Sequence, residues 1–470
     1  MTGAQQRQPV ALSSAPGRWL ILVTVLASGM AFLDATAVQV ALPSIGRELH
    51  ATLSGLQWTV TGYTLTLASL ILLGGSLGDR YGRRKVFVIG VCWFAAASLI
   101  CGVAQNIEQL VAARALQGIG GALLTPGSLA LIQSSFRHQD RARAIGLWSS
   151  LAGISGLVGP FLGGVMVDAV SWRLVFLLNV PFALIIVAVS GRHVPESRDP
   201  TAHGRFDYAG ALLGALALGG ITYALIGAGE SMLRSDVVAA AAIGLLSAAA
   251  FVVRERRAPV PMLPPALFRE RQFTGANLAT LAVYGALGGA GLFMVLQLQT
   301  VLGYDATAAG AAQLPTIALI TLLSPRMGAL ATRIGPRIPM TVGPLIVAVG
   351  TLWLAGVDGS APYVVEILPG SLLQGLGMAV TVAPLTATVL GAAPDAQAGI
   401  ASGVNNAVAR AAQLLAVAAL PVAVGLSGDD YADPAAFTSG FRTAMIICAV
   451  LFAAGGLISW ATIRNDVLQP

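Results

Sequence analysis

The sequence has 470 residues, of which 56% are hydrophobic and 10% charged, whereas a soluble domain carries about 25% charged residues. A soluble protein of this composition could not cover its surface with polar groups, so the soluble fold classes are excluded. The net charge of +6 does not indicate nucleic-acid binding, because the basic residues lie in short segments between long apolar runs, where they orient membrane helices.

The apolar runs predict an all-α polytopic membrane protein with fourteen transmembrane helices, since roughly 20 helical residues cross a bilayer core. The first run is longer than the core of a cleaved signal peptide, about 7–15 residues, so it is predicted to be a transmembrane span rather than a signal. In chain order the predicted spans are 19–40, 56–78, 85–104, 108–132, 142–167, 173–191, 207–227, 236–253, 274–302, 307–330, 338–356, 362–390, 399–425 and 440–463. No polar stretch is long enough for a domain outside the membrane.

The placement of the basic residues tests this number of spans. With the N-terminus inside, 21 of the 27 Lys and Arg residues fall in cytoplasmic segments and four in outer segments, while Arg114 and Arg410 lie within spans. Cytoplasmic loops carry an excess of Lys and Arg, so both termini are predicted to be cytoplasmic. We therefore expect a multi-pass protein of the plasma membrane that contacts the lipid bilayer.

The two halves of the chain resemble each other. Residues 75–84 recur at 328–337 with five identities at an offset of 253, and 116–120 recur at 373–377 at an offset of 257. Six spans occupy only about 190 residues, so the longer offset leaves room for two additional helices. This predicts two six-helix bundles related by pseudo-symmetry plus two inserted helices. The predicted parts are a tail at 1–18, a bundle at 19–191, a linker with two spans at 192–273, a bundle at 274–463 and a tail at 464–470.

Short motifs mark the first half. They lie at 33–43 in span 1, at 74–85 between spans 2 and 3, at 110–120 in span 4, at 159–164 in span 5 and at 172–181 where span 6 begins. Together they resemble the major facilitator superfamily, and most closely its fourteen-span drug:proton antiporter branch. The resemblance implies a multidrug efflux transporter that exports amphipathic organic molecules by alternating access. The proton motive force would supply the energy, without a cofactor.

The sequence departs from the family pattern at three points. Ser155 stands where the span-5 motif has its first glycine, and Gln39 stands where the span-1 motif commonly has asparagine. The span at 307–330 contains no acidic residue, although some relatives that export organic cations carry one there. This absence argues against the export of divalent cations.

Asp34 and Arg114 are predicted to couple transport to protons. Each lies within a span, where a charge costs about 2.5–3.5 kcal/mol even on a lenient scale, so such residues usually face a water-filled cavity or a partner. Asp34 would load and release a proton as the cavity changes sides, or it would hold helices together by a hydrogen bond. Arg114, with Gln117 one turn further on, would tune a cavity carboxylate, engage an anionic group or lock two helices. The sequence does not show whether Asp34 and Arg114 pair directly.

Two motifs are predicted to act as a conformational gate. In the loop at 74–85, glycines permit a tight reversal, and Asp79 would pair with an arginine of another cytoplasmic loop to latch the bundles in one state. The alternative is that the basic residues only hold this loop inside. In span 5, a proline kinks the helix and glycines allow close packing at a seam between halves. The gate residues are Gly75, Asp79, Arg80, Gly82, Arg83, Arg84, Gly159, Pro160, Gly163 and Gly164.

Substrate contacts are predicted for polar and aromatic residues within the spans. These are Gln39, Gln57, Trp58, Tyr63, Gln117, Phe293, Met294 and Gln297. Asn405, Asn406 and Arg410 form a polar stripe in span 13 that either lines the inner vestibule or holds the helix near its cytoplasmic end. Since Asp34 offers a negative site between apolar walls, we expect an amphipathic substrate, neutral or cationic rather than strongly anionic.

Other functions fit the sequence less well. A facilitator or importer of a small metabolite in the same fold is the main alternative, and a non-transporting sensor or scaffold is another. An ATP-driven exporter is excluded because no G-x-x-x-x-G-K-[ST] motif occurs, and the duplication favours alternating access over a channel. The three cysteines lie in apolar runs without a metal or disulfide pattern. A secondary transporter that acts as a monomer on a small molecule and protons, rather than an enzyme, is therefore expected.

Overall fold

The computed structural model describes residues 10–198, 207–258, 261–360, 362–394 and 397–465. Within these ranges the chain is helical and contains no strand. Fourteen helical segments are long and apolar enough to cross a membrane. The predicted fold class and number of spans are therefore confirmed. The tails at 1–9 and 466–470 lie outside the described residues.

The first bundle contains six spans, the last of which is broken. Its helices are α1 (Ala15–Leu49), α2 (Leu53–Tyr81), α3 (Arg83–Gly102), α4 (Ile107–Ser135), α5 (His138–Ala169), α6 (Arg173–Leu177) and α7 (Asn179–His193). The break between α6 and α7 lies at Leu178, just before Pro181, which has no backbone N–H to continue the helical ladder.

The second bundle also contains six spans. Its elements are α10 (Arg271–Leu296), the π-helical η2 (Gln297–Val301), α11 (Ala306–Ala312), α12 (Leu314–Ile334), α13 (Arg337–Leu354), α14 (Tyr363–Glu366), α15 (Leu368–Gly391), α16 (Ala398–Ala423) and α17 (Pro434–Thr462), with the 3-10 turns η1 (Leu267–Arg269) and η4 (Asp430–Ala432). Two spans are interrupted, at Gln313 before Pro315 and at Ile367 before Pro369. As in the first bundle, each break precedes a proline.

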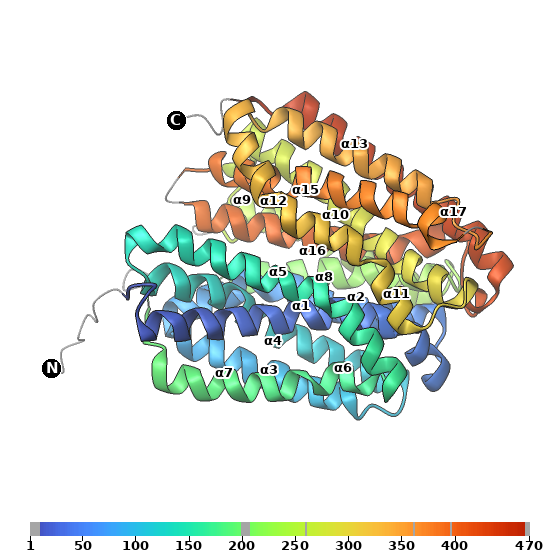
Figure 1. The fold of residues 1–470 in the computed structure, drawn as a ribbon, viewed down its shortest axis with the longest axis horizontal. Coiled ribbons are helices and arrows are strands. Elements are labelled where there is room, and N and C mark those ends of the chain that lie inside the picture. The colour runs from blue at the N-terminus through green and yellow to red at the C-terminus, as the bar shows by residue number, and fades with distance from the viewer. Residues whose placement is uncertain (1–9, 199–206, 259–260, 361, 395–396, 466–470) are drawn as a thin grey trace.

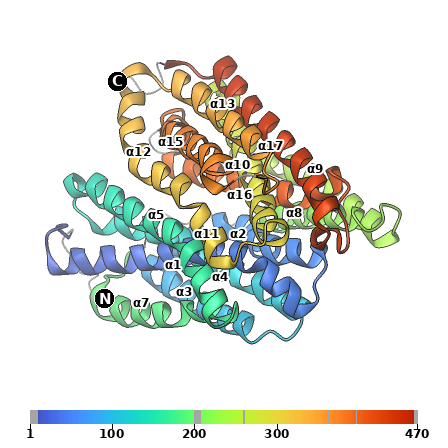
Figure 2. The same cartoon turned by 45° about the vertical axis from the view of Figure 1, so that its right-hand side comes forward.

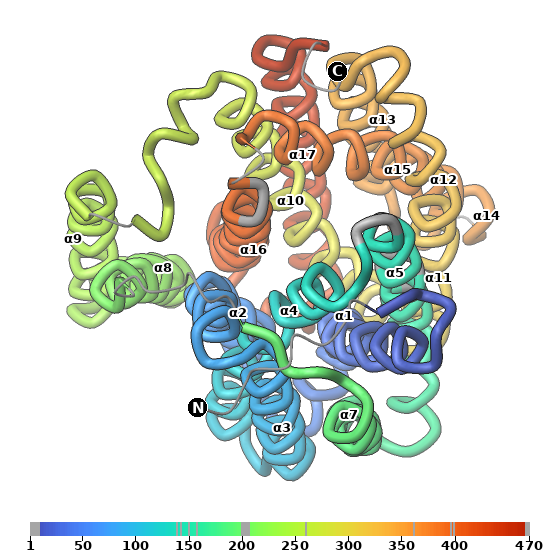
Figure 3. The backbone as a smooth tube through the Cα atoms, turned by 90° about the vertical axis from the view of Figure 1, so that its left-hand side faces the viewer, coloured from blue at the N-terminus to red at the C-terminus, as the bar shows by residue number. Residues whose placement is uncertain are grey.

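The two inserted helices form a pair beside the bundles. α8 (Tyr208–Ala228) and α9 (Ser235–Arg257) cross closely at Gly220 and Gly244, where a Cβ would stand 2.7 and 2.6 Å from the partner backbone. Figure 3 shows the pair outside the two bundles, with α8 next to α2 and α16. The predicted arrangement of six, two and six spans is thus confirmed.

The sequence repeat has a packing basis. In α4, a Cβ at Gly120 would stand 2.5 Å from the backbone nitrogen of Phe94 in α3, and in α15 a Cβ at Gly377 would stand 2.6 Å from the backbone oxygen of Gly343 in α13. These glycines are related by the offset of 257 residues. The fourth span of each bundle therefore packs against the third with backbone contact that a side chain would prevent.

The loops after the second span of each bundle also match. Gly82 (φ 116°) follows α2 and Gly335 (φ 84°) follows α12, in a backbone region that favours glycine. In both places a side chain from beyond the sixth span accepts a hydrogen bond from a backbone N–H in the first turn of the third span. Glu196 does so at 3.0 Å and Asn465 at 3.2 Å. The pseudo-symmetry thus extends to loop geometry.

The first and last spans place the chain's two ends on the same side of the molecule (Figure 1). We call this side the terminal end and the opposite side the distal end. Hydrogen bonds that join the two bundles cluster toward the distal end, and in Figure 2 the bundles converge there. They run, donor first, from Leu53 to Gly428 (2.8 Å), from Gln299 to Val40 (2.8 Å) and from Tyr431 to Ala51 (2.9 Å).

Candidate functional site

A cavity of about 510 Å³ lies between the two bundles. Its wall is formed by α1, α2 and α4 on one side and mainly by α10, α12, α15 and α16 on the other. The distal hydrogen bonds close one end, whereas the wall extends toward the terminal end as far as Leu390 and Ser402, near the end of α15 and the beginning of α16. Most of the wall consists of apolar side chains mixed with amide and hydroxyl side chains, and the volume suits a drug-sized molecule.

Inside the first bundle and beside this cavity, Asp34 and Arg114 form a buried ion pair. Arg114 Nη1 lies 2.6 Å from Asp34 Oδ2, and the two side chains are 2% and 0% exposed. The residues come from α1 and α4. An enclosed charge without a partner would destabilise the fold by about 3–5 kcal/mol, so each residue depends on the other.

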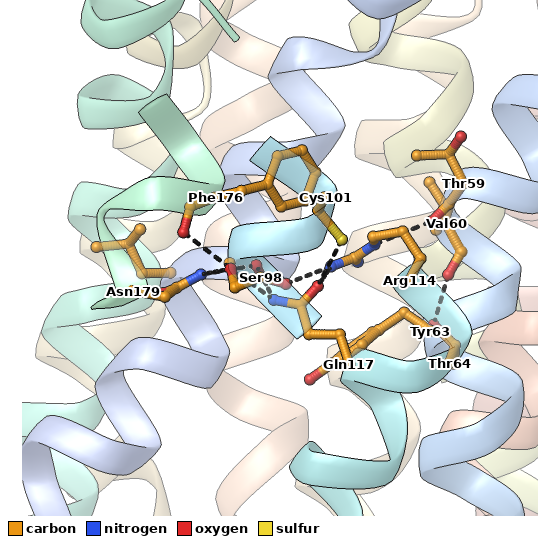
Figure 4. Close-up of polar contacts among 12 residues, drawn as sticks. Thr59, Val60, Tyr63, Thr64, Ser98, Cys101, Arg114, Gln117, Phe176 and Asn179 are labelled. Atoms are coloured by element: carbon orange, nitrogen blue, oxygen red, sulfur yellow. Dashed lines mark hydrogen bonds and ion pairs between the residues drawn. The ribbon is translucent and has the colours of Figure 1, made fainter. Parts of the chain in front are cut away.

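Three neutral side chains complete the hydrogen bonding of the pair. Gln117 accepts from Arg114 (2.6 Å) and donates to Asp34 Oδ1 (2.8 Å), and Asn179 also donates to Asp34 Oδ1 (3.0 Å). Ser98 accepts from both amides, at 3.2 and 2.9 Å. Figure 4 shows these side chains converging from separate helices. The polar cluster therefore connects α1, α3, α4 and α7 at one point.

Arg114 connects this polar cluster to the cavity. Its Nε donates to the carbonyl of Thr59 on α2 (3.1 Å), and its guanidinium carbon lies 4.4 Å from the ring centre of Tyr63. Arg114 and Tyr63 line the cavity, whereas Asp34 does not. This corrects the expectation that Asp34 faces the cavity. A change in the charge of Asp34 would reach the cavity through Arg114.

The sequence matches the family model of the Major Facilitator Superfamily over residues 24–417. The chain belongs to this superfamily. Its family and fold are those of transporters rather than enzymes, and the chain is a multi-pass membrane protein.

Named members of the superfamily cover most of the chain. It is 37% identical to the Multidrug resistance protein Stp of Mycobacterium tuberculosis, over 82% of this chain and 72% of that protein. It is 33% identical to the Tetracenomycin C resistance and export protein of Streptomyces glaucescens, over 88% and 77%. Its fold is similar to the crystal structure of a bacterial homologue of the human lysosomal transporter Spinster in an inward-facing and unoccupied conformation. That comparison gives a TM-score of 0.68 at 17% identity, covering 96% of this chain and 97% of the other.

The eight predicted substrate contacts divide into three groups. Gln39, Tyr63 and Met294 line the cavity, as does Arg114. Gln117 belongs to the polar cluster and does not line the wall.

Four predicted substrate contacts lie elsewhere, which corrects the prediction that they line the cavity. Gln57 donates to the carbonyl of Val417 across the bundles (2.8 Å), and Trp58 lies against Tyr223 of the inserted pair, with ring centres 6.0 Å apart. The other two belong to the second bundle: Phe293 stacks on Phe437 at 5.7 Å and Gln297 donates to the carbonyl of Val357 at 3.0 Å.

The span-5 motif contacts both bundles of this superfamily member. Gly159 and Gly163 face α1, where added Cβ atoms would collide with Thr36 and Ala37. Gly164 faces the other bundle, where a Cβ would collide with the carbonyl of Ala306 on α11. Likewise, a Cβ at Gly310 of α11 would collide with the carbonyl of Pro160. Asp168 accepts hydrogen bonds next to this contact, from the backbone N–H of Thr307 at 2.7 Å and that of Ala306 at 3.2 Å.

The loop at 74–85 is held within its own bundle. Asp79 pairs with Arg83 at 2.8 Å, and Arg84 lies 3.7 Å from Glu196. Arg80 lies over Tyr81, and Gly75 lies close to Pro126 of α4. In this conformation Asp79 pairs within its own loop and not with an arginine of another cytoplasmic loop. The latch, which would form in one state and break in the other, stays a prediction.

The structure adds residues that the sequence did not single out. Asn179 and Ser98 join the polar cluster.

In the second bundle, Asn405 donates to Asn277 (3.2 Å) and to Thr280 (2.7 Å) while also lining the cavity. The two alternatives for the span-13 stripe, cavity lining and helix packing, therefore both hold for Asn405.

Proposed function

We propose that the chain is a proton-coupled antiporter that exports amphipathic small organic molecules, such as drugs, dyes, antibiotics or secondary metabolites, across the plasma membrane by alternating access. Relatives that cover most of its length are named for multidrug resistance and for antibiotic resistance and export. The cavity of about 510 Å³, with mixed apolar and amide walls, supports a substrate of this size and character.

The observation that carries the proposal is the enclosed Asp34–Arg114 pair beside the cavity. A guanidinium does not give up its proton in proteins, so Asp34 is the member of the pair that would carry the transported proton. While Asp34 is ionised, it neutralises Arg114. When Asp34 takes a proton, Arg114 is left as an unpaired cation on the cavity wall, and a conformation that offers it water or another partner is favoured.

The closed distal end, together with the predicted membrane orientation, supports an inward-facing conformation. The basic loops predict that the terminal end faces the cytoplasm. With that orientation, the cavity is accessible from the cytoplasm and sealed from outside. Separation of Gly164 from α11, and of Asp168 from Thr307, would open the outer side. Since one chain supplies both walls, we propose that a monomer completes the cycle.

The test is gradient-driven transport in proteoliposomes. Purified chain would be reconstituted, and efflux of a dye panel with anionic, neutral and cationic members would be followed with and without an imposed proton gradient. The gradient should accelerate efflux by the unaltered protein. Asp34→Asn should remove this acceleration while the protein remains folded. The matched control is Asp236→Asn, which removes an exposed carboxylate on α9 that pairs with Arg234.

The same measurement distinguishes the proposed antiporter from the main alternative, a facilitator or importer. A facilitator in this fold would equilibrate the dye without a response to the gradient, whereas a proton-driven importer would move the dye in the same direction as the protons. If Asp34→Asn kept full gradient-driven efflux, the role of the ion pair in coupling would be refuted.

A further inference from the structure

The cavity wall carries an unbalanced positive charge. Among the described residues that line it, Arg114 and Arg410 are charged and no Asp, Glu, Lys or His occurs. Asp34 neutralises Arg114. None of the ion pairs in the described part of the chain involves Arg410. Its contact with Gln413 Oε1 is long, at 3.5 Å.

Arg410 lies deep in the membrane-spanning part of the protein. It is the thirteenth of the 26 residues of α16. At 1.5 Å per residue, either end of the helix is about 18–20 Å away, which exceeds the reach of an arginine side chain. Arg410 is therefore too far from the cytoplasmic end of the helix to hold it there, which corrects that alternative for this residue. A cation kept at such a depth without a counter-charge is typical of a substrate or ion pathway.

Two amide side chains flank Arg410 on its own helix, and the Nδ2 of one of them, Asn406, also donates to the carbonyl of Ser402 at 3.1 Å. Asn406 and Gln413 stand one turn before and one turn after it on α16, and both line the cavity. Gln39 lines the same cavity from α1. Amide N–H groups around a guanidinium suit an oxyanion, because charge-assisted hydrogen bonds to carboxylates are short and strong.

The rest of the wall suits an apolar body, since Leu287, Met294, Leu298 and Val417 line it. The proposed proton machinery borders the same cavity, since Arg114 and the Tyr63 ring over which it lies also line the wall.

We propose that the transported molecules are amphipathic organic anions, with a carboxylate or comparable acidic group held by Arg410 and an apolar body held by the surrounding wall. This inference rests on the proposed function, since it names the substrate class of that same cavity. It replaces the sequence-based expectation of a neutral or cationic substrate. That expectation required Asp34 to be available in the cavity, whereas Asp34 is enclosed by its own partners.

The test is equilibrium binding without a gradient, so its result does not depend on proton coupling. The probes are dansylglycine, its neutral carboxamide and a dansyl tertiary amine of similar length. Their fluorescence anisotropy would be titrated with purified protein in nanodiscs. The carboxylate should bind about tenfold or more tightly than the amine. Arg410→Gln should remove this preference and leave binding of the carboxamide within about twofold.

Two variants control for folding and for general charge effects. Arg410→Lys keeps the cation and should keep most of the preference for the carboxylate. Arg442→Gln removes an exposed arginine of α17 outside the cavity and should change nothing. Binding of the amine as tight as that of the carboxylate, an unchanged preference in Arg410→Gln, or no binding of any of the three probes would overturn the proposal. Loss of gradient-driven efflux in Asp34→Asn is a separate result and bears only on coupling.

Discussion

Two arginines face the same cavity from opposite bundles, and they differ in the number of partners that satisfy their charge. Arg114 of the first bundle has a carboxylate at 2.6 Å, a carbonyl on α2 and a glutamine beside it. Arg410 of the second bundle has one long contact, to Gln413. The first arginine is internally satisfied, so it suits a switch that opens when its partner is protonated. The second keeps its charge available to a ligand.

The sequence repeat shows that this difference is not a relic of the duplication. Gln117 corresponds to Gln374 at the offset of 257, and at the same offset Arg114 corresponds to Ser371. The second bundle thus lacks the arginine on its fourth span and carries one on its fifth span, α16. Two halves with matching glycine contacts have therefore acquired different polar residues, one set suited to protons and the other to a substrate.

The largest expected effect is a difference in stability between a variant without Arg114 and a variant without Arg410. Arg114→Gln would leave Asp34 charged and enclosed, so the free energy of unfolding should fall by about 3–5 kcal/mol. Arg410→Gln leaves no carboxylate behind, so its effect should stay within about 1 kcal/mol. Thermal unfolding in detergent would compare the two variants with the unaltered protein.

A double variant sharpens this result. Because Asp34→Asn removes the stranded charge, adding it to Arg114→Gln should recover part of the lost thermal stability.

Arg114→Lys should not restore transport fully, since lysine lacks the planar fork that reaches Asp34 and the carbonyl of Thr59 together. Equal losses for Arg114→Gln and Arg410→Gln would contradict the comparison.

An intermediate effect is expected from making the second arginine resemble the first. Gln413 Oε1 already lies 3.5 Å from Arg410 Nη1, so Gln413→Glu should create an internal ion pair. Dansylglycine should then bind about tenfold more weakly, while the tertiary amine should not lose affinity. Gln413→Leu is the matched control, because it removes the amide without adding a charge. If Glu and Leu had the same effect on both probes, Arg410 would not be the anion site.

The sequence predicted the charges within the spans better than it predicted which helix faces line the cavity. Asp34, Arg114 and Arg410 are detectable because a charge within an apolar run is costly. The spans themselves are apolar on most sides, so no periodic pattern tells which side faces the cavity. Gln57 and Trp58 show the consequence, since these adjacent residues of α2 contact α16 and α8, respectively, and neither lines the cavity.

Contacts between residues that are far apart in the chain could not be predicted from the sequence either. Asp34 and Asn179 are separated by 145 residues and meet only because α7 packs beside α1. Asn179 stands within the motif at 172–181, so it carried a signal, whereas Ser98 follows three alanines in α3 and carried none. Asp79 illustrates dependence on conformation. In this conformation it pairs with Arg83 of its own loop, and its role in a latch between bundles stays a prediction.

The smallest expected effect concerns the two glutamines that the repeat relates. Gln117 connects Asp34, Arg114 and Ser98, so Gln117→Ala would leave enclosed polar atoms unsatisfied and should cost about 1–3 kcal/mol. Gln374 donates to Thr351 Oγ1 (3.0 Å), its one hydrogen-bond partner among the described residues, and borders the cavity, where water can replace this bond. Gln374→Ala should therefore lower stability by about 0.5–1.5 kcal/mol at most, without altering proton-driven efflux. Both variants would be assayed by thermal unfolding and by efflux under a gradient. A loss of gradient response in Gln374→Ala that matched the loss in Gln117→Ala would show that the second bundle shares the proton pathway, and the division between the two bundles would then fail.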